Sequence, residues 1–529
     1  MAVGESKEVV CYYGTWATYR QGNGKFTVDD VNPFLCTQLN YAFFDIKSDG
    51  TIRIMDEYLD LPSGLNTIAK FNDLKQKNSA LKTLAAIGGW NAGTANFKAV
   101  AGNPQLRATF ARNAVAFLQK YRFDGMDIDW EYPEPADKTN FVQLLQELAN
   151  AFAPYKYLLT VAVGAPESAA NDSYDIPAIS RIVNYINLMT YDMHGNYGVT
   201  RHHAPVFQGS NSIDDTDYKR QLNLDAVIRY WLSKGASANK LTLGVPFYGR
   251  TFKLANPGVD GVGAPTTGVG AGGRYTQEPG FMGYNEICES SWSRKQFDSV
   301  QGAAFASGNG DWVTYDTVEV IAQKCNLISK YGLGGGMVWS IETDDFKGIC
   351  GPKFTLLSAL NSCVKNGPAP VTTTRTTAKP ATTKPTTRPA TTKPTTRPAT
   401  TKPTTRPATT KPTTRPATTR PAPTTTKAVT AGSGPFVCTR DGFFRDPYDC
   451  NKFYSKIPTV TKERPLEKPP PKEDQAEEPI PKEDQTEEPI PKEDQTEEPT
   501  PKEDQAEEPT QKEGRKEGTT KIGLSRKKS

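Results

Sequence analysis

Three carboxyl residues alternate with apolar residues in the segment Asp124–Glu131, which reads DGMDIDWE. If this segment is a β-strand, Asp127, Asp129 and Glu131 share one face, and the bulky residues between them share the other. Successive carboxyls then lie about 6.5–7 Å apart at their Cα atoms, which is close enough for their titrations to be coupled. A calcium loop would place its acids on a flexible glycine-containing turn instead. The spacing therefore favours a coupled row of carboxyls over a calcium loop or a solvated acidic turn.

The first 366 residues supply the elements that must position these carboxyls. Short apolar runs alternate with amphipathic stretches, and helices are expected at Pro104–Tyr121 and Lys138–Phe152. Eight runs predict strands: Val9–Gly14, Leu39–Asp45, Leu81–Gly88, Phe123–Glu131, Leu158–Val163, Tyr185–Tyr191, Leu241–Pro246 and Gly335–Ser340. This alternation predicts an α/β fold, a (β/α)8 TIM barrel, with Glu131 at the C-terminal end of the fourth strand. In such barrels that end carries the active site.

The remaining segments differ in composition from the barrel. Residues 251–315 are rich in glycine and aromatics and predict a small α+β insertion after the seventh strand, within a catalytic domain of residues 1–366. Thr/Pro repeats fill residues 367–435, where PATTKPTTR occurs four times. They predict a semi-rigid spacer, either an O-glycosylated stalk or an unmodified linker. The charged PKEDQ repeats within residues 457–529 predict a disordered tail.

Composition narrows the class of protein. The chain has 529 residues, 36% of them hydrophobic, and its 41 prolines crowd into the last third. No run of 18 apolar residues occurs, so neither a transmembrane helix nor a membrane partner is expected. The net charge of +4 combines a basic and an acidic tail with a slightly acidic first 370 residues, which disfavours binding to nucleic acid. No glycine-rich phosphate motif follows the first strand, which also disfavours a dinucleotide-binding protein.

The eight cysteines and three histidines of the chain indicate whether it forms disulfides or binds a metal. The cysteines form no CxxC pair, and a histidine-rich metal site is hard to build from three histidines, so disulfides are the better interpretation. Disulfides imply a secreted, extracellular protein, and the glycosylation sequon at Asn171 is compatible with secretion. The first ten residues, MAVGESKEVV, carry charges where a signal peptide has its apolar core. We take the leader as removed or missing.

The string DGMDIDWEYP, which begins at Asp124, resembles the active-site strand of glycoside hydrolase family 18, the chitinases. Met126 and Ile128 stand where the family usually has leucines, and these exchanges conserve volume. Further motifs in the family's order extend the resemblance over the whole barrel: VCYY from Val10, AIGGW from Ala86, LMTYD from Leu188, VPFYGR from Val245 and GMVW from Gly336.

This resemblance implies a retaining hydrolysis in which the substrate's own 2-acetamido oxygen attacks the anomeric carbon. Glu131 would act first as general acid and then as base. Asp129 would hold the acetamido N–H and offset the charge of the oxazolinium intermediate, and Asp127 behind it would share a proton. Tyr191 would donate to the acetamido oxygen, and Asp192 would contact the sugar at the cleavage site. Because carboxyls and substrate suffice for this mechanism, no metal or cofactor is expected.

Sugar rings stack their apolar faces on aromatic side chains, so a polysaccharide cleft needs aromatic residues at the ends of the strands. By likeness to the family, Trp339 forms the floor beneath the distorted sugar. Candidates for the flanking subsites are Tyr12, Trp16, Trp90, Met189, Tyr248 and Arg250. The histidines receive no role.

The cysteines fit the same family. Cys11–Cys36 and Cys288–Cys350 resemble its disulfides, and Cys325 and Cys363 are left to pair by elimination. The last two cysteines lie in residues 436–456, which resemble the start of a peritrophin-A type chitin-binding module. That family needs six cysteines and this segment supplies two, so we expect a truncated module that binds chitin weakly if at all.

These observations predict a secreted, monomeric endo-chitinase of the arthropod type that hydrolyses β-1,4 bonds between N-acetylglucosamine units of chitin and chito-oligosaccharides. The alternative is a non-catalytic chitin-binding lectin on the same barrel. Such lectins typically lack the terminal acid, and Glu131 is present. A third interpretation, a structural or allergen-like protein whose tails carry the function, draws on the repeats alone.

Overall fold

The computed structural model describes residues 7–195, 198–367, 442–445 and 453–456. The chain divides into two compact units, residues 1–386 and 387–529. In the second unit the described residues form two short antiparallel strands, β16 (Gly442–Arg445) and β17 (Phe453–Lys456), within the segment expected to be a truncated module. The predicted spacer, apart from Gly367, and the predicted charged tail lie outside the described residues.

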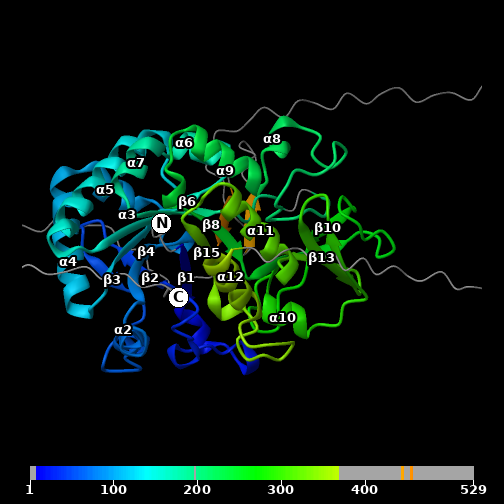
Figure 1. The fold of residues 1–529 in the computed structure, drawn as a ribbon, viewed down its shortest axis with the longest axis horizontal. Coiled ribbons are helices and arrows are strands. Elements are labelled where there is room, and N and C mark those ends of the chain that lie inside the picture. Colours follow the sequence, from blue (N-terminus) through cyan, green and yellow to red (C-terminus); the bar gives the residue numbers. More distant parts are fainter. Residues whose placement is uncertain (1–6, 196–197, 368–441, 446–452, 457–529) are drawn as a thin grey trace, which may run out of the picture. The chain divides into compact units, whose positions relative to one another are not determined.

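A closed barrel of parallel strands forms the centre of the first unit (Figure 1). Among the described residues it has eight strands, which neighbour one another in the order β1-β15-β8-β7-β6-β5-β4-β2, and a β1–β2 pairing closes the ring. The strands are β1 (Glu8–Gly14), β2 (Gln38–Ile46), β4 (Lys82–Gly88), β5 (Gly125–Asp129), β6 (Leu158–Gly164), β7 (Tyr185–Met189), β8 (Leu241–Pro246) and β15 (Gly335–Trp339). A further short strand, β3 (Ile52–Ile54), pairs antiparallel with β2. The predicted TIM barrel is confirmed.

Helices return the chain between the strands and surround the barrel (Figure 1). They are α1 (Glu57–Asp60), α2 (Thr67–Lys77), α3 (Ala95–Gly102), α4 (Pro104–Tyr121), α5 (Lys138–Phe152), α6 (Glu167–Ser173), α7 (Ile176–Ile182), α8 (Asp217–Arg220), α9 (Leu224–Ser233), α11 (Val318–Lys330) and α12 (Thr355–Asn366). Short 3-10 helices lie at Thr15–Tyr19, Gly22–Gly24, Val28–Asp30, Trp90–Ala92, Pro135–Asp137, Ala153–Tyr155, Ala238–Lys240 and Ile341–Thr343. In this part of the chain, no helix has both the length and the apolar content to cross a membrane.

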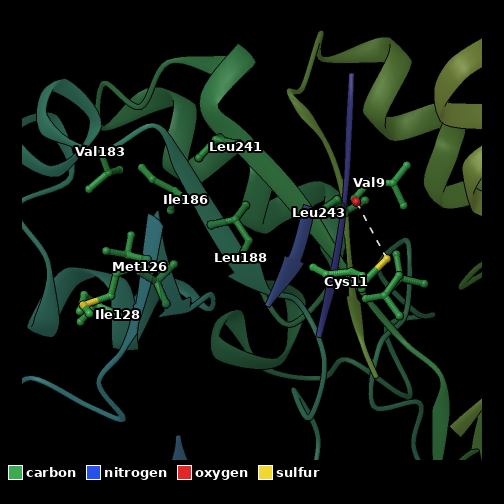
Figure 2. Packing of buried hydrophobic residues seen from close by; sticks show 14 of the residues in the cluster. Val9, Cys11, Met126, Ile128, Val183, Ile186, Leu188, Leu241 and Leu243 are labelled. Carbon is green, nitrogen blue, oxygen red and sulfur yellow. Dashed lines mark hydrogen bonds between the residues drawn. The ribbon is translucent and has the colours of Figure 1, made fainter. Parts of the chain in front are cut away.

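The main hydrophobic core lies between the strands and the helices, because alternate strand residues point outward. Met126 and Ile128 of β5 are fully buried there. Figure 2 shows them with Ile186 and Leu188 of β7 and other residues of the same cluster. The residues between these positions, such as Asp127, consequently face the barrel interior. The strand period thus places the carboxyls of β5 inside the barrel, as the sequence predicts.

The predicted insertion is a separate small sheet that follows β8. Its strands are β9 (Tyr248–Leu254), β10 (Thr266–Val269), β11 (Phe281–Gly283), β12 (Arg294–Asp298), β13 (Ala303–Gly308) and β14 (Asp311–Tyr315), with one helix, α10 (Tyr284–Glu289). All its pairings are antiparallel, and β9 pairs with β10, β11 and β14. Since β9 starts two residues after β8, the insertion continues directly from a barrel strand.

Disulfides tie the barrel's elements together. Within the described residues the structure contains the three predicted pairs: Cys11–Cys36, Cys288–Cys350 and Cys325–Cys363. The first joins β1 to the segment before β2, the second joins α10 to the loop after β15, and the third joins α11 to α12.

Candidate active site

Asp127 of β5 is the centre of a polar layer inside the barrel and is fully buried. Its carboxylate accepts hydrogen bonds from the Tyr12 hydroxyl (2.6 Å), the Thr160 hydroxyl and the Asn187 amide (3.0 Å). These three partners come from β1, β6 and β7. Burial raises the pKa of Asp127, and the three hydrogen bonds oppose that rise. Three strands therefore hold this carboxyl in one orientation.

Asp129 is the last residue of β5 and is 3% exposed. Its Oδ1 is buried and has no hydrogen-bond partner within the described part of the chain. Burial raises the pKa of Asp129 well above its usual range, and the charges of Glu131 and Asp127 raise it further. Gly88 (φ +118°) makes room beside it, because a Cβ on Gly88 would lie 2.0 Å from the Asp129 carbonyl oxygen. An unpaired buried oxygen is costly, so this atom is the natural acceptor for a bound molecule.

Glu131 lies two residues beyond the end of β5, on the turn that follows the strand. The strand ends earlier than predicted because Asp129 pairs with Gly88, where β4 also ends. Burial raises the pKa of Glu131 to about 7; a hydrogen bond from Tyr132 opposes this rise, and the charge of Asp192 adds to it. A carboxyl with this pKa can be protonated near neutral pH, as a general acid must be.

Trp130 anchors the turn that carries Glu131. Its indole is buried, stacks on Phe97 with ring centroids 5.3 Å apart, and packs edge-on against Phe141. The indole N–H donates to the Thr94 hydroxyl at 2.7 Å. Trp130, which precedes Glu131 and points outward, thus holds the turn against helices α3 and α5.

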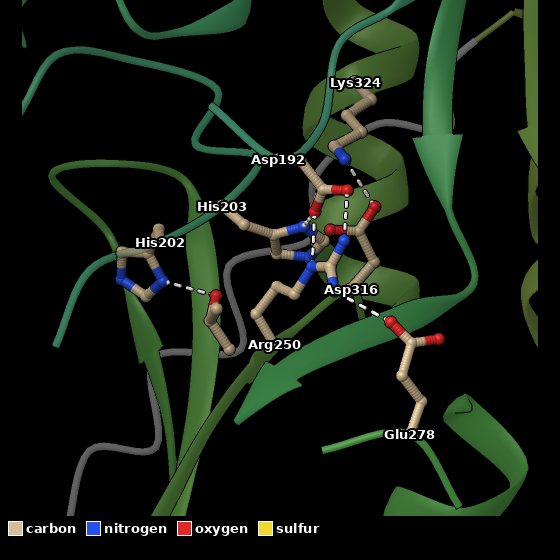
Figure 3. Close-up of polar contacts among 8 residues, drawn as sticks. Asp192, His202, His203, Arg250, Glu278, Asp316 and Lys324 are labelled. Atoms are coloured by element: carbon tan, nitrogen blue, oxygen red, sulfur yellow. Dashed lines mark hydrogen bonds and ion pairs between the residues drawn. The ribbon is translucent and has the colours of Figure 1, made fainter. Parts of the chain in front are cut away.

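Asp192 follows β7 and is held by two side chains (Figure 3). Arg250 of β9 donates through Nε to Oδ1 (2.7 Å) and through Nη2 to Oδ2 (2.5 Å), and Nδ1 of His203 lies 3.2 Å from Oδ1. Burial disfavours the charge on Asp192, but Arg250 outweighs it and holds the pKa of this carboxyl well below its usual range. Its φ of +56° is in the left-handed region, which few non-glycine residues adopt and in which aspartate is over-represented.

Aromatic side chains line the C-terminal end of the barrel. Trp339, at the end of β15, stacks on Phe43 with centroids 5.7 Å apart and contacts Tyr12 and Trp16. Trp339 and Phe43 also pack, with Met189 and Tyr191, on a small interior cluster of their own: Val10, Tyr12, Ala42, Ala86, Ala162 and Met337. Trp16 is 40% exposed and Trp90 is 61% exposed, so both present indole surface to solvent. Carboxyls with raised pKa values can donate protons, and exposed aromatic rings can stack on sugars. Together they suit the acid-catalysed cleavage of a sugar polymer.

Comparison with known proteins identifies the family of this barrel. Residues 8–344 match the family described as Glycosyl hydrolases family 18. The chain belongs to this family. Membership confirms the prediction of a glycoside hydrolase, and the family match covers the eight barrel strands, the insertion and every predicted catalytic and substrate-binding residue.

Individual relatives of this family 18 chain include proteins named as chitinases and one described as a pseudo-chitinase. The chain is 35% identical over 393 residues to "Probable chitinase 10" of Drosophila melanogaster, a match that covers 70% of this chain and 17% of that protein's length. It is 44% identical to the crystal structure of Ostrinia furnacalis Group IV chitinase in complex with allosamidin, with a TM-score of 0.66 and coverage of 69% and 100% of the two chains. It is 33% identical to human YKL-39, described as a pseudo-chitinase with retained chitooligosaccharide binding properties, with a TM-score of 0.63 and coverage of 67% and 98%.

The structure places the predicted site residues of this family 18 chain in different surroundings. Trp16, Trp90, Asp192, Arg250 and Trp339 are at least partly open to solvent. Tyr12 and Tyr248 were expected in sugar subsites, yet they are 1% and 2% exposed. Tyr12 donates to Asp127, and Tyr248 stacks on Phe281. Met189 and Tyr191 pack on the interior cluster. Their roles toward a ligand stay predictions.

Several residues of the site escaped the sequence analysis. Thr160 and Asn187 bind Asp127, Phe43 stacks on Trp339, and His203 contacts Asp192. The inward positions of the predicted strands could have indicated Thr160 and Asn187, because each lies between two outward apolar residues. Nothing in the spacing of His203 could have paired it with a residue eleven positions earlier across a loop.

Proposed function

We propose that this chain is a secreted chitinase that hydrolyses β-1,4 bonds between N-acetylglucosamine units, within the chain of the polymer, with retention at the anomeric carbon. The observation that carries the proposal is the pair formed by Glu131, whose pKa is raised to about 7, and Asp129, whose buried Oδ1 has no hydrogen-bond partner among the described residues. The disulfides support secretion. The allosamidin complex of a solved relative supports a chito-oligosaccharide as the ligand.

In the proposed reaction the substrate supplies the nucleophile. Oδ1 of Asp129 would accept the acetamido N–H and turn the acetamido oxygen toward the anomeric carbon. As that oxygen forms its bond to carbon, the glycosidic bond breaks and Glu131 gives its proton to the leaving oxygen. Water then attacks the oxazolinium intermediate, and Glu131 takes the proton of that water. Two inversions at one carbon return the β-anomer.

Oligosaccharide binding without turnover is the second candidate function. It has a specific basis, because human YKL-39 is described as a pseudo-chitinase that retains chitooligosaccharide binding. The presence of Glu131 at the end of the carboxyl row favours hydrolysis for this chain. Direct measurement of product separates the two functions.

The deciding experiment follows a short chito-oligosaccharide by NMR and reads the anomer released at early times. For Glu131→Gln we expect a loss of about three decades in kcat, the scale reached when a general acid is removed. Glu134→Gln is the matched control, because Glu134 is three residues away, exposed and paired with Lys98 at the surface.

The outcomes distinguish the candidates. Early β-anomer from the wild type, lost in Glu131→Gln and kept in Glu134→Gln, supports the retaining chitinase. Early α-anomer contradicts the substrate-assisted mechanism, even if chitin is the substrate. A folded wild type that binds the oligomer without turning it over is a lectin.

A further inference from the structure

His203 occupies a buried position next to the site that the proposed reaction does not use. Asp192 lies beyond the end of β7, and the backbone N–H of the next residue, Met193, donates to the His203 carbonyl at 2.9 Å. This bond holds His203 beside Asp192. The side chain of His203 is 1% exposed.

The His203 imidazole shares one carboxylate oxygen with Arg250. Nδ1 of His203 lies 3.2 Å from Oδ1 of Asp192, and Nε of Arg250 lies 2.7 Å from the same atom (Figure 3). Since Asp192 is ionised, it can only accept, so the hydrogen of the neutral imidazole must be on Nδ1. Burial lowers the pKa of His203, which keeps the ring neutral even though its bond to Asp192 acts in the opposite direction.

Among the described residues, the groups around the His203 ring form no second hydrogen bond with it. The Tyr248 ring of β9 packs against it with centroids 5.1 Å apart. The charge of Asp316, which follows β14, also acts on the ring, and Asp316 is itself paired with Lys324 of α11 at 2.5 Å. Nε2 of His203 has no hydrogen-bond partner within the described residues. Burying a polar ring costs free energy, and an apolar side chain would fill the same space without that cost. We therefore take the contact with Asp192 as the chemical role of His203.

We propose that His203 is a positioning residue that, together with Arg250, fixes the Asp192 carboxylate in the orientation in which it faces the cleavage site. This inference rests on the proposed function, because the orientation of Asp192 matters for catalysis only if the chain hydrolyses a sugar polymer at this site. Arg250 alone holds Asp192 through a long side chain that is 31% exposed. The rigid, buried ring of His203 adds a third contact to the Asp192 carboxylate, from a residue outside β9.

Three substitutions at His203 separate the polar contact from the ring. His203→Asn keeps an N–H near the position of Nδ1, His203→Gln moves it toward the position of Nε2, and His203→Leu removes it. We expect kcat on a chito-oligosaccharide to fall about tenfold or more for Leu and Gln, the size of one hydrogen bond to a charged group. We expect His203→Asn to stay within about threefold of wild type and KM to change little throughout. His202→Asn is the matched control, because His202 is equally buried but binds Thr314 at 2.9 Å instead of Asp192.

A second readout does not need turnover. The chain has three histidines, so selective 15N labelling of histidine gives a spectrum that single variants can assign. We expect His203 in the wild type to carry its proton on Nδ1 between pH 5 and 8, and to lose this preference in Asp192→Asn.

Each outcome decides the proposal. Rescue by Asn, but not by Gln or Leu, with the Nδ1–H tautomer in the wild type, supports it. Equal loss in all three folded variants means that the ring acts by packing, and equal activity in all three means that the contact is idle; either result overturns it. If the folded wild type does not hydrolyse the oligomer, the proposed function fails. The tautomer then decides alone: its dependence on Asp192 supports positioning, and its independence overturns it.

Discussion

Glu131 and Asp192 form an unequal pair of carboxyls at the mouth of the barrel. Burial and the charge of Asp192 raise the pKa of Glu131 to about 7, whereas Arg250 keeps Asp192 ionised. Each carboxyl thus has a fixed role: one holds a proton that it can give away, and the other supplies a constant negative charge.

The activity should therefore be lost as the pH rises through about 7. The protonated form of Glu131 is the active one, so kcat/KM is retained below its pKa and falls above it. In Asp192→Asn the negative charge that raises this pKa is gone, and the basic limb of kcat/KM should move to lower pH. The pH profiles of both proteins on a soluble oligomer check this. A limb that stays in place or moves to higher pH contradicts the assignment of Glu131 as the acid.

The sequence predicts the residues of the site better than it predicts their partners. Asp127 and Asp129 follow from the two-residue period of one strand, which is local information. The partners of Asp127 lie on three other strands, and Arg250 reaches Asp192 from 58 positions away. Those contacts depend on strand register and on the placement of the insertion, which no local pattern contains.

At the scale of elements, the turn after β5 depends on Trp130 for its position. Removing a buried tryptophan side chain costs about 3–5 kcal/mol, so Trp130→Ala should lower the free energy of unfolding by that amount in a urea titration. It should also lower kcat in the folded protein, because the turn that carries Glu131 loses its contacts with Phe97 and Thr94.

The control for this prediction is Phe152→Ala. Phe152 is 1% exposed and ends helix α5, away from the turn that carries Glu131. The Phe152→Ala variant should lose a similar free energy of unfolding and keep the kcat of the wild type. If both variants change kcat alike, the effect of Trp130 is one of general stability and not of the turn.

Elements with local signals were predicted well. Helix α4 has the predicted bounds because Asn103 caps its first amides and Pro104 occupies its first turn. Strands β5 and β7 are shorter than predicted. A strand extends only as far as neighbouring strands pair with it, and an apolar run in the sequence does not show where that pairing ends. The insertion begins at Tyr248 rather than near residue 251 for the same reason, since β9 is defined by its partners.

At the scale of the whole molecule, the first unit contains every residue that the proposed mechanism uses. Its last helix, α12, is tied to α11 by Cys325–Cys363, and the carboxyls of the proposed mechanism all precede it. A chain that ends at Gly367 should therefore keep the thermal midpoint of the barrel and its kcat/KM on soluble oligomers. Calorimetry and the oligomer assay check this. A large drop in either quantity would show that residues after Gly367 contribute to the barrel.

Helix α12 also fixes where the chain leaves the barrel. Leu360 packs on Gly336 at the start of β15, and the Asn361 amide donates to the Leu35 carbonyl, just before β2. The helix therefore ends at the rim where the strands begin, opposite the rim that bears Trp339. A bead or electrode coupled at Gly367 would hold every copy with its catalytic mouth turned away from the support, so an immobilised catalyst made in this way would be oriented by the fold itself.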